Sequence, residues 1–238
     1  MPAKKRETQP LKKTQKKATK KAVSKKDFSV ATAKKSADLL KESNDFPIVG
    51  IGASAGGLEA LEIFLSNLPP ETNMAFVIIQ HLSPRHKSIM AEILMKYTQM
   101  KVSAIQEDKE IKPNCVYLNP PDRNVVILNR RLYLTEPTQA HGVNLPIDCF
   151  FRSLSEDQGE KAICIILSGT ATDGTLGLKA IKGEGGMAMV QDPDSAKYSG
   201  MPISAIATGL VDFILPVEKI PAELIKYVRH PYIERPER

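Results

Sequence analysis

The chain has 238 residues, of which 42% are hydrophobic, which is enough for the core of one ordinary domain plus a polar tail. No apolar run approaches the roughly 18–20 residues that span a bilayer, and the Lys-rich start lacks the pattern of a secretory signal. These features argue against a membrane-spanning or secreted protein and predict a cytoplasmic location.

The formal net charge of +6 is concentrated in residues 1–45, which hold 13 Lys and one Arg against five acidic residues. The segment is too polar to bury a core, and we predict a disordered Lys-rich arm. The favoured interpretation is a solvated linker or leader, and the alternative is attraction to an anionic surface, whether nucleic acid, membrane or acidic partner. Specific nucleic-acid binding is not expected, because few aromatic residues lie among the lysines.

Cysteine and histidine usage argues against cross-links and metals. Cys115, Cys149 and Cys164 are odd in number and lack CxxC spacing, as expected for reduced thiols in a cytoplasmic protein. The four histidines show no paired metal-ligand spacing. We therefore expect no metal site.

From residue 46 onward, apolar strand-like runs alternate with helical patterns. The predicted strands are 47–52, 74–80, 101–106, 162–168, 187–191 and 211–215. The predicted helices are 58–67, 88–97, 146–154, 175–182, 204–208 and 220–228. Three short β runs, at 116–118, 125–128 and 132–134, are predicted to form an antiparallel meander at the sheet edge.

The alternation predicts an α/β fold with a doubly wound, mainly parallel sheet. We assign the catalytic domain to 46–230 and a C-terminal tail to 231–238. The chain could be complete at that point or continue as a longer protein.

Three polar residues follow three of the apolar runs. Ser54 follows 47–52, His81 follows 74–80, and Asp173 lies just past 162–168. In an open α/β sheet, ligands bind outside the carboxyl ends of the parallel strands. The sequence therefore predicts that a nucleophile, a base and an orienting acid meet in one crevice, as a Ser-His-Asp hydrolase requires.

Residues 52–56 form a G-x-S-x-G sequence at a strand-to-helix junction, which resembles a nucleophile elbow. The glycines allow a sharp turn and close substrate approach. The following helix directs backbone N–H groups and a positive dipole end at Ser54. We expect N–H groups near Ala55 and Gly56 to hold an oxyanion.

The same segment also reads as G-x-G-x-x-A, from Gly50, Gly52 and Ala55, a weak dinucleotide-binding fingerprint. That interpretation requires an acidic residue at the end of the second strand. Gln80 and His81 occupy that place, so a nucleotide-binding Rossmann-like domain is the less favoured alternative.

His81 and Asp173 each have a simpler interpretation. His81 could be a solvated loop histidine, and His86 is its rival as the base. Asp173 could be the N-cap of the helix that follows it, a role compatible with orienting a histidine. The chain order Ser–His–Asp differs from the order in α/β-hydrolases and disfavours that fold.

Several ordered motifs resemble the catalytic domain of the chemotaxis protein-glutamate methylesterase family over about 46–230. They are Ile51-Gly52-Ala53-Ser54-Ala55-Gly56-Gly57, Gln80-His81-Leu82, Leu167-Ser168-Gly169 with Asp173-Gly174, and Tyr198-Ser199-Gly200-Met201-Pro202. The resemblance implies a doubly wound α/β hydrolase that uses no cofactor. It also implies release of methanol from glutamate γ-methyl esters on cytoplasmic helices of methyl-accepting chemotaxis receptors, and deamidation of receptor glutamines in many members.

By the same resemblance, Ser54 is the nucleophile, His81 the general base and acid, and Asp173 the orienting carboxylate. The loop 198–202, with Tyr198 and Met201, would shape the substrate site. A catalytically idle regulatory module of a chemosensory system is the alternative from a different functional class.

Two departures from the family pattern matter. A Lys-rich arm stands where members usually carry a receiver domain, so phosphorylation control within the chain is not expected. Thr170 replaces a methionine associated with oxyanion binding, although a backbone N–H there does not depend on the side chain.

Motifs such as Pro-Ile-Asp-Cys-Phe-Phe at 146–151 resemble methylesterase domains fused to methyltransferase and sensor modules, which makes a methyltransferase or sensor kinase a candidate partner.

Overall fold

The computed structural model describes residues 46–81, 89–137 and 144–230, all within a unit that begins at Phe46. The arm 1–45, the tail 231–238 and His86 lie outside the described residues. The domain boundaries therefore stay predictions from the sequence.

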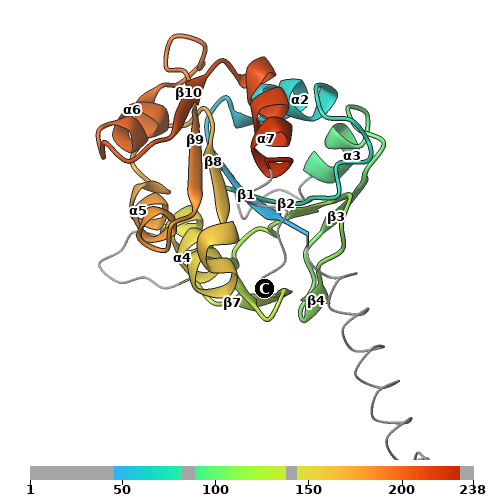
Figure 1. The fold of residues 1–238 in the computed structure, drawn as a ribbon. Helices are drawn as coiled ribbons and strands as arrows, with labels where there is room; N and C mark the ends of the chain where they lie inside the picture. The colour runs from blue at the N-terminus through green and yellow to red at the C-terminus, as the bar shows by residue number, and fades with distance from the viewer. Residues whose placement is uncertain (1–45, 82–88, 138–143, 231–238) are drawn as a thin grey trace, which may run out of the picture. The chain divides into compact units, whose positions relative to one another are not determined.

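Within the described ranges, the main sheet has seven strands, in the order β10-β9-β8-β1-β2-β5-β3 (Figure 1). All of its pairings are parallel. The strands are β1 (Ile48–Ala53), β2 (Ala75–Gln80), β3 (Lys101–Ala104), β5 (Cys115–Leu118), β8 (Ile163–Ile166), β9 (Met187–Gln191) and β10 (Phe213–Leu215). The central strands β1 and β8 are buried along their whole length, as their continuous apolar runs predict.

Strand β1 lies at the point where the chain changes direction across the sheet. Its neighbour on one side is β2 and on the other side β8. Ala53 is in register with Gln80, and Gly52 with Ile166, so the three strands end at nearly the same level. Residues that follow these strands therefore emerge together at the edge where ligands bind in doubly wound folds.

Helices cover both faces of the sheet, as predicted (Figure 1). One core packs α4 (Pro146–Gln158), α5 (Thr175–Gly183) and α6 (Gly200–Ile206) against one face. The other core packs α2 (Gly57–Ser66), α3 (Met90–Leu94) and α7 (Ile220–Val228) against the opposite face. None of the helices in the described ranges is long and apolar enough to cross a membrane.

The predicted meander at the edge of the main sheet differs from the structure in two respects. The second and third β runs are antiparallel, as β6 (Asn124–Leu128) and β7 (Arg131–Thr135), and form a separate small sheet with β4 (Lys109–Glu110). The first run is β5, which lies in the main sheet, parallel to β2 and β3. The reason lies in the connections, because Pro120 and Pro121 cannot continue a ladder after β5.

The hairpin between β6 and β7 has the turn that such a connection needs. Asn129 and Arg130 both have positive φ, 50° and 59°, which is the conformation that two-residue hairpin turns favour.

Helix α6 begins four residues earlier than predicted, at Gly200. Pro202 lies in its first turn, where the missing N–H has no partner within the helix in any case.

Candidate active site

Ser54 follows β1 and begins a tight turn into α2. Gly56 has φ 69°, in the left-handed region, and a Cβ added there would lie 2.7 Å from Ser168 Oγ. The N–H of Gly57 donates to the carbonyl of Ser54 at 2.8 Å, which closes the turn. The predicted elbow is therefore built on a position that requires glycine.

Ser168, two residues after the end of β8, holds this elbow in place. Its carbonyl accepts a hydrogen bond from the N–H of Ser54 at 3.0 Å. Its buried hydroxyl donates to the carbonyl of Ala55 at 2.9 Å and accepts from the N–H of Tyr198 at 3.0 Å. The role of Ser168 depends on three separate segments, so the motif that contains it in the sequence does not reveal it.

The His81 ring lies between Ser54 and Asp173. Its Nδ1 is 3.1 Å from Ser54 Oγ, and its Nε2 is 2.9 Å from Asp173 Oδ2. The arrangement is satisfied by the tautomer that carries its proton on Nε2, because the carboxylate can only accept and Nδ1 can then accept from the serine hydroxyl. The three side chains thus form one continuous chain of hydrogen bonds.

Asp173 is held from all sides by backbone N–H groups. Its Oδ2 accepts from Ile147 at 3.0 Å, and its Oδ1 accepts from Asp148 and Gly174, both at 2.9 Å. Ile147 and Asp148 lie in the first turn of α4, so Asp173 caps α4 from another part of the chain. The simpler interpretation of Asp173 was a cap of its own helix, but the N-cap of α5 is Gly174, without a side-chain hydrogen bond.

Asp148 is a second buried carboxylate beside Asp173, and no pattern in the sequence marked it as a candidate site residue. Its Oδ1 accepts from the N–H of Gly177 in α5 at 2.7 Å. Burial raises the pKa of Asp148 above its usual value, the bond from Gly177 lowers it, and the charge of Asp173 raises it further. Helices α4 and α5 are therefore capped reciprocally, each by an aspartate from the other segment.

Two of the described cysteines, Cys149 and Cys164, are poor nucleophiles. Burial raises the pKa of Cys149, and the nearby charge of Asp173 raises it further. Burial also raises the pKa of the fully buried Cys164. Both thiols stay protonated at neutral pH, so Ser54 has no thiol competitor from these two residues.

Backbone N–H groups are available where an oxyanion would form. The N–H groups of Ala55, Gly56 and Thr170 make no hydrogen bond to any other described residue. Thr170 is exposed, and Ala171 beside it has φ 71°, a strained conformation for a residue with a Cβ. This loop and the elbow flank Ser54, since a Cβ on Gly169 would lie 2.9 Å from the Cβ of Ser54.

The two residues predicted in the substrate loop have different surroundings. Tyr198 is exposed, whereas Met201 is completely buried against Gly169. Met201 therefore has no exposed surface in this structure, and it can shape the substrate site only through the position of the loop.

The glycines of the alternative dinucleotide fingerprint have a packing explanation. A Cβ on Gly50 would lie 2.9 Å from the ring of Phe151, and one on Gly52 would lie 2.5 Å from Cγ2 of Ile147. Both contacts come from α4, so these glycines allow the helix to approach β1 closely. The fingerprint is explained without a nucleotide.

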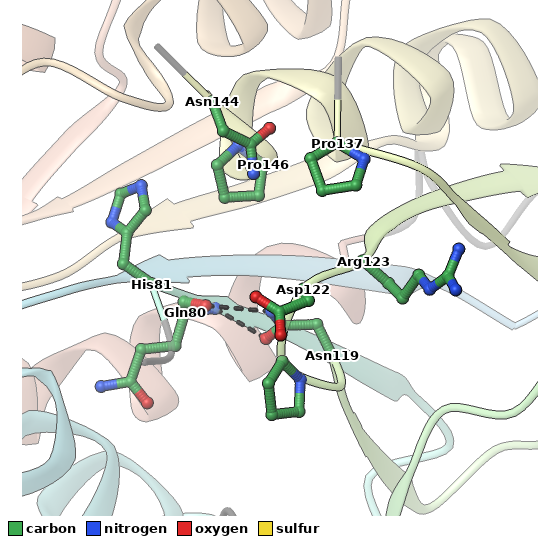
Figure 2. Close-up of a pocket in the computed structure, with 9 residues that line it drawn as sticks. Gln80, His81, Asn119, Asp122, Arg123, Pro137, Asn144 and Pro146 are labelled. Atoms are coloured by element: carbon green, nitrogen blue, oxygen red, sulfur yellow. Dashed lines mark hydrogen bonds between the residues drawn. The ribbon is translucent and has the colours of Figure 1, made fainter. Parts of the chain in front are cut away.

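A cavity of about 270 Å³ opens beside His81. It is lined by Gln80, His81, Asn119, Pro121, Asp122, Arg123, Pro137, Asn144 and Pro146. Figure 2 shows that the side chain of Asn119 faces the backbone of Gln80 and makes two hydrogen bonds to it. No pattern in the sequence singled out Asn119.

Comparison with known proteins places this arrangement in a family. The family model described as CheB methylesterase matches residues 49–224. A protein from Leptospira interrogans, named only as a candidate protein-glutamate methylesterase/protein-glutamine glutaminase, is 38% identical over 181 residues, which are 76% of this chain and 93% of that protein. The protein-glutamate methylesterase/protein-glutamine glutaminase of Thermotoga maritima is 31% identical over 185 residues, 76% of this chain and 54% of that protein.

The fold agrees with these sequence relations. The crystal structure of the CheB methylesterase catalytic domain of Thermotoga maritima superposes with a TM-score of 0.72 at 31% identity, covering 77% of this chain and 100% of that chain. This chain thus spans nearly the whole Leptospira relative and about half of the Thermotoga protein. The chain belongs to the CheB methylesterase family.

Proposed function

We propose that this protein hydrolyses γ-methyl esters of glutamate side chains on chemoreceptors and releases methanol, with Ser54 as the nucleophile. The observation that carries the proposal is the chain of hydrogen bonds from Ser54 Oγ through His81 to Asp173, at 3.1 and 2.9 Å. Family membership supplies the substrate class.

In the first half of the reaction, Ser54 Oγ attacks the ester carbonyl while Nδ1 of His81 takes its proton. The carboxylate of Asp173 stabilises the imidazolium through Nε2–H. The N–H groups of Ala55 and Thr170 stabilise the developing oxyanion. Collapse of the tetrahedral intermediate breaks the bond to methoxide, which leaves as methanol with the proton from His81.

In the second half, His81 removes a proton from water, and the hydroxide attacks the acyl carbon. The second tetrahedral intermediate expels Ser54, which recovers its proton from His81. The glutamate carboxylic acid formed then ionises to the carboxylate and releases its proton to water. The same steps with ammonia as the leaving group convert glutamine to glutamate, so receptor deamidation belongs to the proposal.

The finer assignments follow from the family's role in chemosensory systems. The substrates are methyl-accepting receptors, and a cytoplasmic location agrees with modification of their cytoplasmic helices. A methyltransferase or sensor kinase module is the proposed partner, and the Lys-rich arm 1–45 is proposed to contact anionic surfaces. An idle regulatory module is the rival, and the unbroken hydrogen-bond chain at Ser54 favours an enzyme over it.

The test is methanol release from methylated receptor membranes by the wild type and by Ser54→Ala. Loss of the nucleophile is expected to lower kcat by about 10⁴–10⁶-fold. Ser66→Ala, at an exposed serine in α2, is the matched control and should retain full activity. A Ser54→Ala variant with a tenth of the wild-type rate would remove Ser54 from the mechanism, and a wild type that releases no methanol would favour the idle module.

A further inference from the structure

We propose that Asn119 is a positioning residue for His81. Its side-chain amide pairs with the backbone at the end of β2, where the backbone of β5 no longer does. The inference concerns the geometry of His81 and rests on the proposed function only for its effect on the rate.

Backbone pairing between β2 and β5 stops before the end of β2, where Gln80 leads into His81. The last paired residues are Ile78 and Leu118, and the N–H of Asn119 still donates to the carbonyl of Ile78 at 3.2 Å. Pro120 and Pro121 follow and have no N–H to donate. The C=O of Gln80 therefore has no ladder donor on this side, and the N–H of Gln80 also bonds a side chain in place of a backbone carbonyl.

The Asn119 amide satisfies both groups. Its Oδ1 accepts from the N–H of Gln80 at 2.9 Å, and its Nδ2 donates to the C=O of Gln80 at 2.9 Å (Figure 2). Only 6% of Asn119 is exposed, so water is a poor substitute for the amide. The carboxylate of an aspartate could accept the first bond but could not donate the second.

The clamp acts on the peptide unit that joins Gln80 to His81. That unit contains the C=O of Gln80, and fixing its plane fixes the direction in which the His81 side chain leaves the backbone. The His81 side chain is itself 34% exposed, so packing constrains it less than it constrains Asp173. A base displaced by about 1 Å loses on the order of 10²-fold in rate.

The same strand offers a matched control at its other end. Asn114, just before β5, also uses its Oδ1 to accept two backbone N–H groups, from Thr72 and Asn73, both at 2.8 Å. Asn114 therefore connects the start of β5 to the segment just before β2, at the end of these strands away from Ser54. Asn114 has φ 55°, so its replacement by alanine adds backbone strain to the lost bonds and is the harsher change for stability.

The experiment compares the full chain as wild type, Asn119→Ala, Asn119→Asp and Asn114→Ala. For Asn119→Ala, kcat for methanol release should fall about 10–100-fold while KM stays within about twofold. Asn114→Ala should lose at least as much melting temperature and keep the wild-type kcat. Equal loss of kcat in both alanine variants, or none in Asn119→Ala, would overturn the proposal.

Asn119→Asp separates the two bonds of the clamp. It keeps an acceptor for the N–H of Gln80 but turns an oxygen towards the C=O of Gln80. We expect kcat to fall as it does in Asn119→Ala, and full wild-type kcat in this variant would contradict a clamp that needs both bonds.

A readout independent of activity separates this inference from the proposed function. Protein labelled with ¹⁵N-histidine reports which ring nitrogen carries the proton, and His81→Gln assigns the His81 signals. At neutral pH the wild type and Asn114→Ala should show the Nε2–H tautomer for the neutral ring, whereas Asn119→Ala should show a mixture. Unchanged signals in Asn119→Ala would overturn the positioning role, even if the wild type hydrolyses esters. Altered signals would support the positioning role, even if no form of the protein hydrolyses esters.

Discussion

The acid and the base of the candidate site are held by two different kinds of structure. The Asp173 side chain is 1% exposed and accepts hydrogen bonds from three backbone N–H groups, from Ile147, Asp148 and Gly174. The His81 side chain is 34% exposed, and one amide clamps the residue before it. Asp173 therefore stabilises the fold through its bonds to the backbone, whereas His81 is only held in position by its neighbours.

The difference predicts that loss of either residue abolishes activity but only loss of the acid weakens the fold. Asp173→Asn and His81→Gln should each lower kcat by about 10⁴-fold or more. In Asp173→Asn, an NH₂ group faces N–H donors at the start of α4, so the free energy of unfolding should fall by about 1–3 kcal/mol. Urea denaturation checks this, and equal midpoints for the two variants would show that the acid is no more embedded than the base.

A second change weakens the acid side without touching a catalytic residue. In Gly52→Ala the new Cβ would lie 2.5 Å from Cγ2 of Ile147, whose N–H is bonded to Asp173. We expect about 1–3 kcal/mol of lost stability from this overpacking, together with reduced kcat, as measured by denaturation and methanol release. Gly183→Ala is the control, because it is helical and a Cβ there meets nothing within 4 Å, so it should be neutral or stabilising.

A smaller, pH-dependent effect is expected at Asp148. Its pKa is raised in the folded state by burial, so the folded protein holds this proton more tightly than the unfolded chain does. The Asp148 contribution to stability is therefore greatest below the ordinary carboxyl pKa of about 4 and declines as pH rises through the folded pKa.

Asp148→Asn removes that decline and keeps an oxygen for the N–H of Gly177. The melting temperature of the variant relative to the wild type should therefore rise between acid and neutral pH. A difference that stays constant over this range would mean that the carboxyl of Asp148 is not perturbed by its burial.

The smallest effect should come from the rim of the site. Lys197, next to Tyr198, bonds Glu59 Oε1 at 2.6 Å, and this contact lowers the pKa of Glu59. Both side chains are more than half exposed, so water and salt screen the pair. Lys197→Ala should leave the melting temperature nearly unchanged, and a large loss would show that loop 198–202 needs this exposed anchor.

Local patterns in the sequence predicted most of the strands and helices of the main sheet and its two covering layers. The continuous apolar runs of β1, β2 and β8 mark buried parallel strands, and the residues that follow them must emerge at one edge of the sheet. Helix α7 and strand β9 have the predicted bounds, 220–228 and 187–191. Ser54 and His81 could be selected in this way because each directly follows its strand, where period and turn signals suffice. Asp173 lies further from its strand, in the loop between β8 and α5.

What only the tertiary structure decided is which distant groups satisfy the polar atoms of these segments. Asp173 caps α4 across 25 or 26 positions, and Asn119 clamps Gln80 across 39. No local pattern marks such pairs, because an aspartate before a helix and an asparagine before two prolines each have an ordinary local explanation. The sequence by itself determined the strands and the residues that follow them. The packing of α4 and β5 decided how firmly Asp173 and His81 are held, because buried N–H and C=O groups must find partners wherever the fold provides them.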